Sequence, residues 1–177
     1  GDFSHASLIS RINSDLANDI GNLLSRSTAM LVKYFDGALP APGQLTELDL
    51  ALKSKAETMI TTVDACMDEL AFSKALQAIW EVIGAGNKYI DETTPWALAK
   101  DPANQERLAT VMYCLLEVQR LIHSLVAPFM PETAHKALTC LGWTAELSQH
   151  DLVWGRLPAG TVINKAEALF PRIETKE

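Results

Sequence analysis

Cysteine is scarce in this 177-residue sequence, and its three cysteines, Cys66, Cys114 and Cys140, stand far apart. They form no Cys-x-x-Cys motif and no even set, so the sequence predicts neither a zinc site nor a disulfide framework. A chain of this length buries about 70% of its unfolded surface on folding and does not need such cross-links. Scattered thiols are typical of a reducing compartment, and we expect a cytoplasmic protein.

Long hydrophobic runs are also missing. No uninterrupted apolar stretch approaches the roughly 18 residues that a membrane span requires. Residues 1–15 contain neither the basic region nor the apolar region of a secretion signal. We therefore expect no membrane partner. Because the sequence starts at Gly1 without a methionine, we also expect it to be part of a longer chain.

Positive charge is in the minority. The sequence has 15 Lys and Arg against 22 Asp and Glu, which gives a net charge of −7. Phosphate binding depends on Lys and Arg that release counterions, so this balance argues against a broad nucleic-acid surface and against DNA as a partner. Any nucleic-acid site would have to be local.

Apolar residues at three- and four-residue steps are abundant, and few segments alternate with period two. This is the pattern of amphipathic helices. The run of residues 104–127 is the most apolar and is expected to be the central helix. The predicted fold is all-α: an antiparallel bundle of about five helices in residues 1–142, with residues 143–177 as a tail packed along it. The predicted helices cover residues 7–35, 43–70, 71–92, 104–127 and 131–142.

Local signals refine these helices. Thr46 is expected to cap the second helix, whose apolar face is expected to include Leu48 and Leu70. The Gly84-Ala85-Gly86 run weakens the third helix and predicts a close-packed or bent middle. Thr94 is predicted to cap a short turn that extends to residue 100 and has Pro95 in its first position.

No catalytic constellation is visible. The four histidines are far apart, and His123, in an apolar run, is expected to be a satisfied interior or half-buried residue. Paired acids such as Asp15 and Asp19 have the spacing of a solvated helix face. The Gly-Ala-Gly run lacks the rest of a dinucleotide-binding motif. The sequence therefore predicts no catalytic residue and no metal site.

One polar stripe on the first helix can carry chemistry. Asn22, Arg26, Ala29 and Lys33 fall on the same side, opposite the apolar stripe. Arginine offers a planar fork of donors, and asparagine offers both a donor and an acceptor, which suits base edges or phosphates. A purely solvated outer face explains the same pattern, so the sequence leaves both interpretations open.

Trp96 also has two interpretations. Tryptophan is usually mostly buried, which places the ring in the interior beneath the Gly84–Gly86 region. An exposed ring could instead stack on an unpaired base, an interaction worth about 1–3 kcal/mol that depends little on net charge.

Five segments taken together resemble the anticodon-binding domain of methionyl-tRNA synthetases, a helical bundle of class I synthetases. They occur in the same order and span nearly the whole chain. Related isoleucyl, valyl, leucyl and cysteinyl enzymes share the bundle, but the middle segment joined to the Asn-Leu-Leu-Ser-Arg run is similar to the methionine branch. The segments are "INSDLANDIGNLLSR" at 12–26, "KYFDG" at 33–37, "NKYIDETTPWALAK" at 87–100, "APFMPETA" at 127–134 and "LFPRIE" at 169–174.

The resemblance implies that the bundle binds the CAU anticodon loop of the methionine tRNA. Asn22 and Arg26 match the residues that hydrogen-bond the anticodon bases, and Pro95 and Trp96 match the pair on which a base stacks. A proline at the helix start would order the ring before RNA arrives.

Position and charge, rather than a motif, add Arg11, Lys33 and Lys88 as candidate phosphate contacts.

The signatures that bind ATP in this family, and its zinc-knuckle cysteines, are absent from the sequence. The resemblance thus implies no cofactor in this chain, with ATP, magnesium and zinc belonging to a catalytic domain elsewhere in the parent enzyme. That domain is the second expected partner, approached by the tail, and a further RNA-binding module could follow Glu177. Two other hypotheses remain: a helical protein-interaction module, and the anticodon domain of a related class I synthetase.

Overall fold

The computed structural model describes residues 2–143 and 148–166. These residues form α-helices and short 3₁₀ turns, and within them the only β pairing is an isolated bridge between Ala38 and Val162. The α-helices are α1 (Asp2–Phe35), α2 (Glu47–Asp68), α3 (Phe72–Thr93), α4 (Pro95–Leu98), α5 (Gln105–Val126) and α6 (Pro131–Cys140), and the 3₁₀ turns are η1 (Pro102–Asn104) and η2 (Gln149–Asp151).

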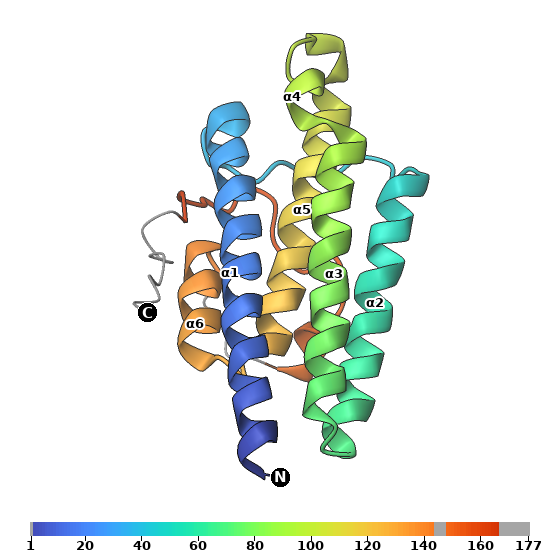
Figure 1. The fold of residues 1–177 in the computed structure, drawn as a ribbon. Helices are drawn as coiled ribbons and strands as arrows, with labels where there is room; N and C mark the ends of the chain where they lie inside the picture. The colour runs from blue at the N-terminus through green and yellow to red at the C-terminus, as the bar shows by residue number, and fades with distance from the viewer. Residues whose placement is uncertain (1, 144–147, 167–177) are drawn as a thin grey trace.

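Five of these helices pack into a bundle (Figure 1). Helices α1 and α3 run in one direction, α2 and α5 run in the other, and α4 forms a single turn at the upper end of the bundle in the figure. Helix α5 contacts α1, α2, α3, α4 and α6. The predicted all-α bundle is therefore confirmed, and so is the central position of the helix predicted at residues 104–127.

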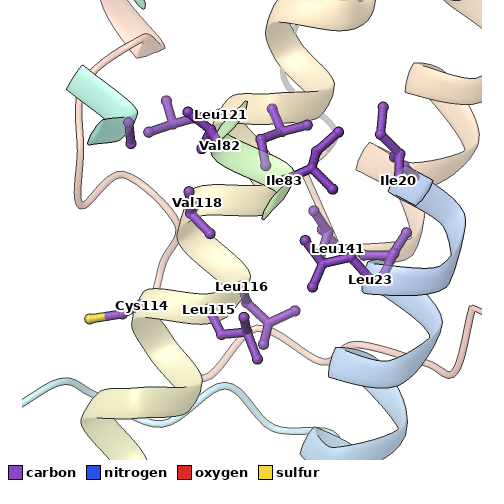
Figure 2. Packing of buried hydrophobic residues seen from close by; sticks show 14 of the residues in the cluster. Ile20, Leu23, Val82, Ile83, Cys114, Leu115, Leu116, Val118, Leu121 and Leu141 are labelled. Atoms are coloured by element: carbon purple, nitrogen blue, oxygen red, sulfur yellow. The ribbon is translucent and has the colours of Figure 1, made fainter. Parts of the chain in front are cut away.

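The core surrounds α5 on all sides. Every residue from Thr110 to His123 is buried, so this helix has no solvated face along more than three turns. Figure 2 shows core side chains such as Leu23 of α1, Ile83 of α3 and Leu116 of α5 gathered between the helices. The three cysteines are buried and free.

Gly86 lets α1 and α3 approach each other closely. Helix α3 continues without a break through its glycines. A Cβ atom on Gly86 would lie 3.0 Å from Cδ2 of Leu23, whereas one on Gly84 would meet nothing within 4 Å. Of the two predicted outcomes, the structure therefore has the close-packed middle, and Gly86 is the residue that permits it.

The predicted apolar face of α2 is wrong at both ends. Leu48 and Leu70 are 38% and 72% exposed, whereas Asp49 is fully buried. The buried stripe passes through Asp49 and Leu52, one residue away from the expected Leu48. A carboxylate can occupy that position only because neighbouring helices supply it with donors.

Asp49 joins three helices at the upper end of the bundle. Arg107 of α5 donates to it twice, at 2.6 and 3.0 Å, and the Tyr89 hydroxyl of α3 donates at 2.5 Å. The backbone N–H of Thr46, the predicted cap of α2, donates at 2.9 Å. Burial by itself raises the pKa of Asp49, but these donors and the Arg107 charge outweigh it, and the pKa lies below its usual value.

His123 is fully buried on α5, but it is not satisfied as the sequence had indicated. Neither of its ring nitrogens has a hydrogen-bond partner in the described structure. Burial lowers the pKa of His123 to about 3, because the charged imidazolium would lose its hydration. The side chain therefore stays neutral at physiological pH and acts as a core residue.

Two buried charges on α5 hold the tail. The Arg120 guanidinium contacts the Glu117 carboxylate at 2.6 Å and donates to the carbonyl oxygens of Asp151 and Val153 at 2.8 and 2.9 Å. Glu117 accepts from the backbone N–H groups of Gly155 and Arg156. Both side chains are fully buried, so the backbone of the tail completes their hydrogen bonding.

Further contacts continue this docking toward α1. The Leu157 carbonyl accepts from the Tyr113 hydroxyl, and the Ala166 N–H donates to the Thr28 hydroxyl. Residues 148–166 thus lie along the bundle. Residues 167–177, which include the 169–174 segment of the resemblance, are outside the described part, and the approach of the tail to a catalytic domain stays a prediction.

Arg120→Leu should lower the free energy of unfolding by about 3–5 kcal/mol, because it leaves the Glu117 carboxylate buried without its counter-charge. Urea denaturation measures this difference. Lys88→Gln is the matched control, since it removes the exposed Lys88–Glu92 pair and should cost about 0.5 kcal/mol or less. Equal effects of the two substitutions would contradict the assigned role of the buried pair.

Asp49 should contribute an acid-sensitive part of the stability. Its folded pKa is depressed, so its contribution is complete above the unfolded value of about 3.8 and is lost as the pH falls through the folded pKa. Asp49→Asn should therefore be less stable than the wild type at pH 7, and this difference should shrink below about pH 3.8. Urea titrations across the acid range measure it. A difference that stays constant at all pH values would rule out this linkage.

Candidate nucleic-acid interface

The chain turns directly after α3, and this turn leaves Trp96 exposed to solvent. Thr94 has φ 44° and ψ 68°, the left-handed region that β-branched residues rarely adopt. It occupies the predicted cap position of α4, but its side chain makes no capping hydrogen bond; its N–H donates to the Ile90 carbonyl instead. Pro95 then fixes the first helical position and is buried, while Trp96 is 42% exposed. The indole is therefore an ordered side chain with a face open to solvent.

The polar stripe of α1 lies beside this ring. Asn22, Arg26 and Lys33 are all exposed. The Cζ atom of Arg26 is 5.9 Å from the centroid of the Trp96 ring, within the range of a cation–π interaction. The structure thus brings together Arg26 and the Pro95–Trp96 pair, with Asn22 one turn earlier on the same face of α1.

Asp91 is a member of this cluster that the sequence analysis missed. Its carboxylate lies 3.5 Å from the Arg26 guanidinium, and the two side chains are 69% and 43% exposed. An ion pair this exposed contributes about 0–1 kcal/mol, so it orients Arg26 without locking it. Asp91 belongs to the same segment as Trp96, but only the packing of α3 on α1 brings it to the arginine.

The three candidate phosphate contacts are spread along α1 and α3. Arg11 is exposed but lies 15 residues before Arg26, about 22 Å along the helix. Lys88 pairs with Glu92 at 3.6 Å, and the Lys33 ammonium lies 5.8 Å from the Tyr34 ring. Lys33 continues the Arg26 stripe by two turns, whereas Arg11 is on a separate part of the surface.

Asp19 is not on a solvated face as its spacing had indicated. It is half-buried, and its carboxylate accepts a 2.6 Å hydrogen bond from the indole N–H of Trp80 on α3. The periodicity of α1 gives only the side of the helix, so it could not reveal a partner 61 residues away. Asp19 lies one turn before Asn22 on α1.

Other kinds of site find no support in the described part of the chain. Residues 2–143 and 148–166 hold no group of three or more His, Cys, Asp or Glu side chains arranged to bind a metal ion. Over the same residues, none of the helices combines the length and the apolar character needed to cross a membrane. The cluster around Trp96 offers an aromatic face, a guanidinium and an amide.

Proteins of known family resemble this chain in sequence. A family model described as the anticodon binding domain of methionyl tRNA ligase matches residues 39–177. The methionine–tRNA ligase of Caldanaerobacter subterraneus is 49% identical over all of this chain, and that of Bacillus subtilis is 45% identical over all of it. These matches cover 28% and 27% of the two ligases. The chain thus spans less than a third of the length of these relatives.

Solved structures agree with the sequence relatives. The structure of apo Mycobacterium tuberculosis methionyl-tRNA synthetase superposes with a TM-score of 0.85 at 37% identity, covering 97% of this chain and 35% of that one. The family model begins after α1, so it includes Trp96 but not Asn22 or Arg26. The full-length sequence relatives and this structure extend the likeness to α1. The chain therefore belongs to the family of anticodon-binding domains of methionyl-tRNA ligases.

Proposed function

We propose that this domain recognises the CAU anticodon loop of the methionine tRNA, with Trp96 as the stacking platform and Asn22 and Arg26 as the groups that hydrogen-bond the bases. The observation that supports this most directly is the half-open indole with a guanidinium 5.9 Å from its centroid. An unpaired base needs both a flat apolar surface and directed polar partners, and the cluster offers both.

Trp96 suits stacking because it is ordered before RNA arrives. Pro95 fixes the backbone dihedral next to it, and the buried proline ring anchors the turn. Little conformational entropy then has to be lost on binding, so more of the stacking energy appears as affinity. Every base has a π face, so this contact supplies affinity, while the neighbouring polar groups must supply the choice of base.

Arg26 and Asn22 are suited to that choice. Arginine donates through a planar fork, and asparagine both donates and accepts. Together they can distinguish one base from another by the hydrogen-bonding groups on its edge. Asp91 holds Arg26 near the ring in the free protein. Because that ion pair is exposed and weak, a base edge can replace the carboxylate at small cost.

The acidic balance of the chain is compatible with this mode of binding. A net charge of −7 leaves little electrostatic attraction for a phosphate backbone. Stacking and base-edge hydrogen bonds depend much less on net charge. Arg11, Lys33 and Lys88 remain proposed phosphate contacts, and Lys33 has the best support because it extends the Arg26 stripe.

The parent protein would be a methionine–tRNA ligase, the name that the relatives have. We infer that the remainder of the parent attaches methionine to the tRNA with ATP and magnesium, that any zinc belongs there, and that this domain supplies recognition. The tail at 143–177 would face that catalytic domain, which is the second proposed partner. Such a role in translation places the protein in the cytoplasm.

Trp96→Ala should weaken binding to a CAU anticodon stem-loop by about 1–3 kcal/mol, because a stacked base loses its platform. The loss of stability should be small, since the ring is 42% exposed. Fluorescence anisotropy with a labelled stem-loop measures the affinity, and thermal melting measures the stability. Trp154→Ala, which removes a partly buried indole from the tail, is the matched control and should leave the affinity unchanged.

The same assay separates the other two hypotheses. Stem-loops with altered anticodons should bind more weakly than CAU, and a preference for another anticodon would indicate a related class I synthetase. A protein-interaction module would show unchanged RNA affinity in the Trp96→Ala variant. Unchanged affinity together with a large drop in melting temperature would contradict the proposal.

A further inference from the structure

The proposed anticodon site is divided between two helices that meet along one interface. Asn22 and Arg26 belong to α1, whereas Trp96 follows directly on α3 through the Thr94 turn. The distance between the guanidinium and the indole therefore depends on how α1 is placed along α3. The 5.9 Å separation is already near the limit of about 6 Å for a cation–π contact.

A small slip between these helices would break the cluster. One residue of helix corresponds to a rise of about 1.5 Å and a rotation of about 100°. A shift of that size would carry Arg26 out of reach of the ring and turn Asn22 away from it. Some feature of the α1–α3 interface must therefore fix the register.

Most of the α1–α3 contact is apolar and has little directional preference. Leu23 packs on Gly86, and the Arg26–Asp91 ion pair is exposed and loose at 3.5 Å. Asp19 and Trp80 differ from these, because the indole N–H points at a charged carboxylate at 2.6 Å. In the described part of the chain, this is the only hydrogen bond between side chains of α1 and α3. Such charge-assisted bonds are short and strongly directional.

We propose that Asp19 and Trp80 are positioning residues for the anticodon site: their hydrogen bond sets the register of α1 on α3 and so the distance from Arg26 to Trp96. The inference rests on the proposed function. Asp19 lies seven residues before Arg26, about 10 Å along the same helix, so it acts through the helix and not by touching RNA. Trp80 is partly buried in the interface and holds the acceptor in a fixed place.

Two substitutions at Asp19 isolate the hydrogen bond from the charge. Asp19→Asn and Asp19→Leu remove the same negative charge and are similar in size, but only asparagine keeps an acceptor for the Trp80 N–H. Asp19→Leu should bind the CAU stem-loop roughly 3- to 10-fold more weakly than Asp19→Asn. Trp80→Phe, which keeps a ring but loses the donor, should lose affinity for the stem-loop by a similar factor relative to the wild type. The double variant Asp19→Leu/Trp80→Phe should be no worse than either single one.

Tyr113→Phe is the matched control for general destabilisation. It also removes one aromatic donor, the hydroxyl bonded to the Leu157 carbonyl, but at the contact between α5 and the tail. It should lower the melting temperature by an amount similar to Trp80→Phe and leave RNA affinity unchanged. Equal RNA affinity of Asp19→Leu and Asp19→Asn, or an equal loss in Tyr113→Phe, would overturn the proposal.

A measurement without RNA keeps this test separate from the proposed function. The chain has four tryptophans, so its labelled indole N–H groups give four resonances in a ¹⁵N–¹H spectrum. The Trp96 resonance should shift in Asp19→Leu and Trp80→Phe but not in Asp19→Asn or Tyr113→Phe. If the wild-type chain fails to bind the stem-loop, the proposed function fails, and this shift alone decides whether Asp19 and Trp80 position Arg26. An unmoved Trp96 resonance would overturn the positioning role.

Discussion

The complete burial of α5 from Thr110 to His123 is the constraint on which the rest of the structure depends. The charged side chains that such a helix buries need hydrogen-bond partners, and other elements supply many of them. Glu117 and Arg120 therefore take the backbone of the tail as their partner, and Gln119 donates to the Ser27 hydroxyl of α1. Nearer its start, the partly exposed Arg107 takes Asp49 of α2. These hydrogen bonds hold the tail, α1 and α2 around α5.

The candidate interface is a consequence of that arrangement at the edge of the bundle. Helices α1 and α3 both pack on α5, and Gly86 allows them to meet closely. The Asp49 network ties Tyr89 near the end of α3 to α2 and α5, so the turn at Thr94 starts from a fixed point. A rigid scaffold with a short irregular turn at its end is a common way to hold a binding residue in the open.

The sequence predicted the parts of the structure that depend on local pattern. Helix periods, the break before Pro95 and the apolar character of α5 follow from spacing and backbone chemistry, so the bundle and the turn could be derived. Partners distant in sequence could not. Leu48 was expected inside because it is apolar, yet it is exposed, and the neighbouring Asp49 is buried where Tyr89 and Arg107 of other helices donate to it. The contact between Asp19 and Trp80 was hidden for the same reason.

An acidic domain that recognises RNA as proposed must obtain its affinity from contacts that do not depend on total charge, and the candidate interface offers such contacts. The indole is ordered by its backbone, and the guanidinium is held near it by a carboxylate too exposed to bind it tightly. In the free protein, Asp91 also weakens the attraction of Arg26 for phosphate groups. Its negative charge lies within a few ångströms of the guanidinium and repels them. A ligand then gains most when it offers a flat base and a matching edge together. Selectivity in such a site follows from geometry, and geometry here follows from how α1 lies on α3.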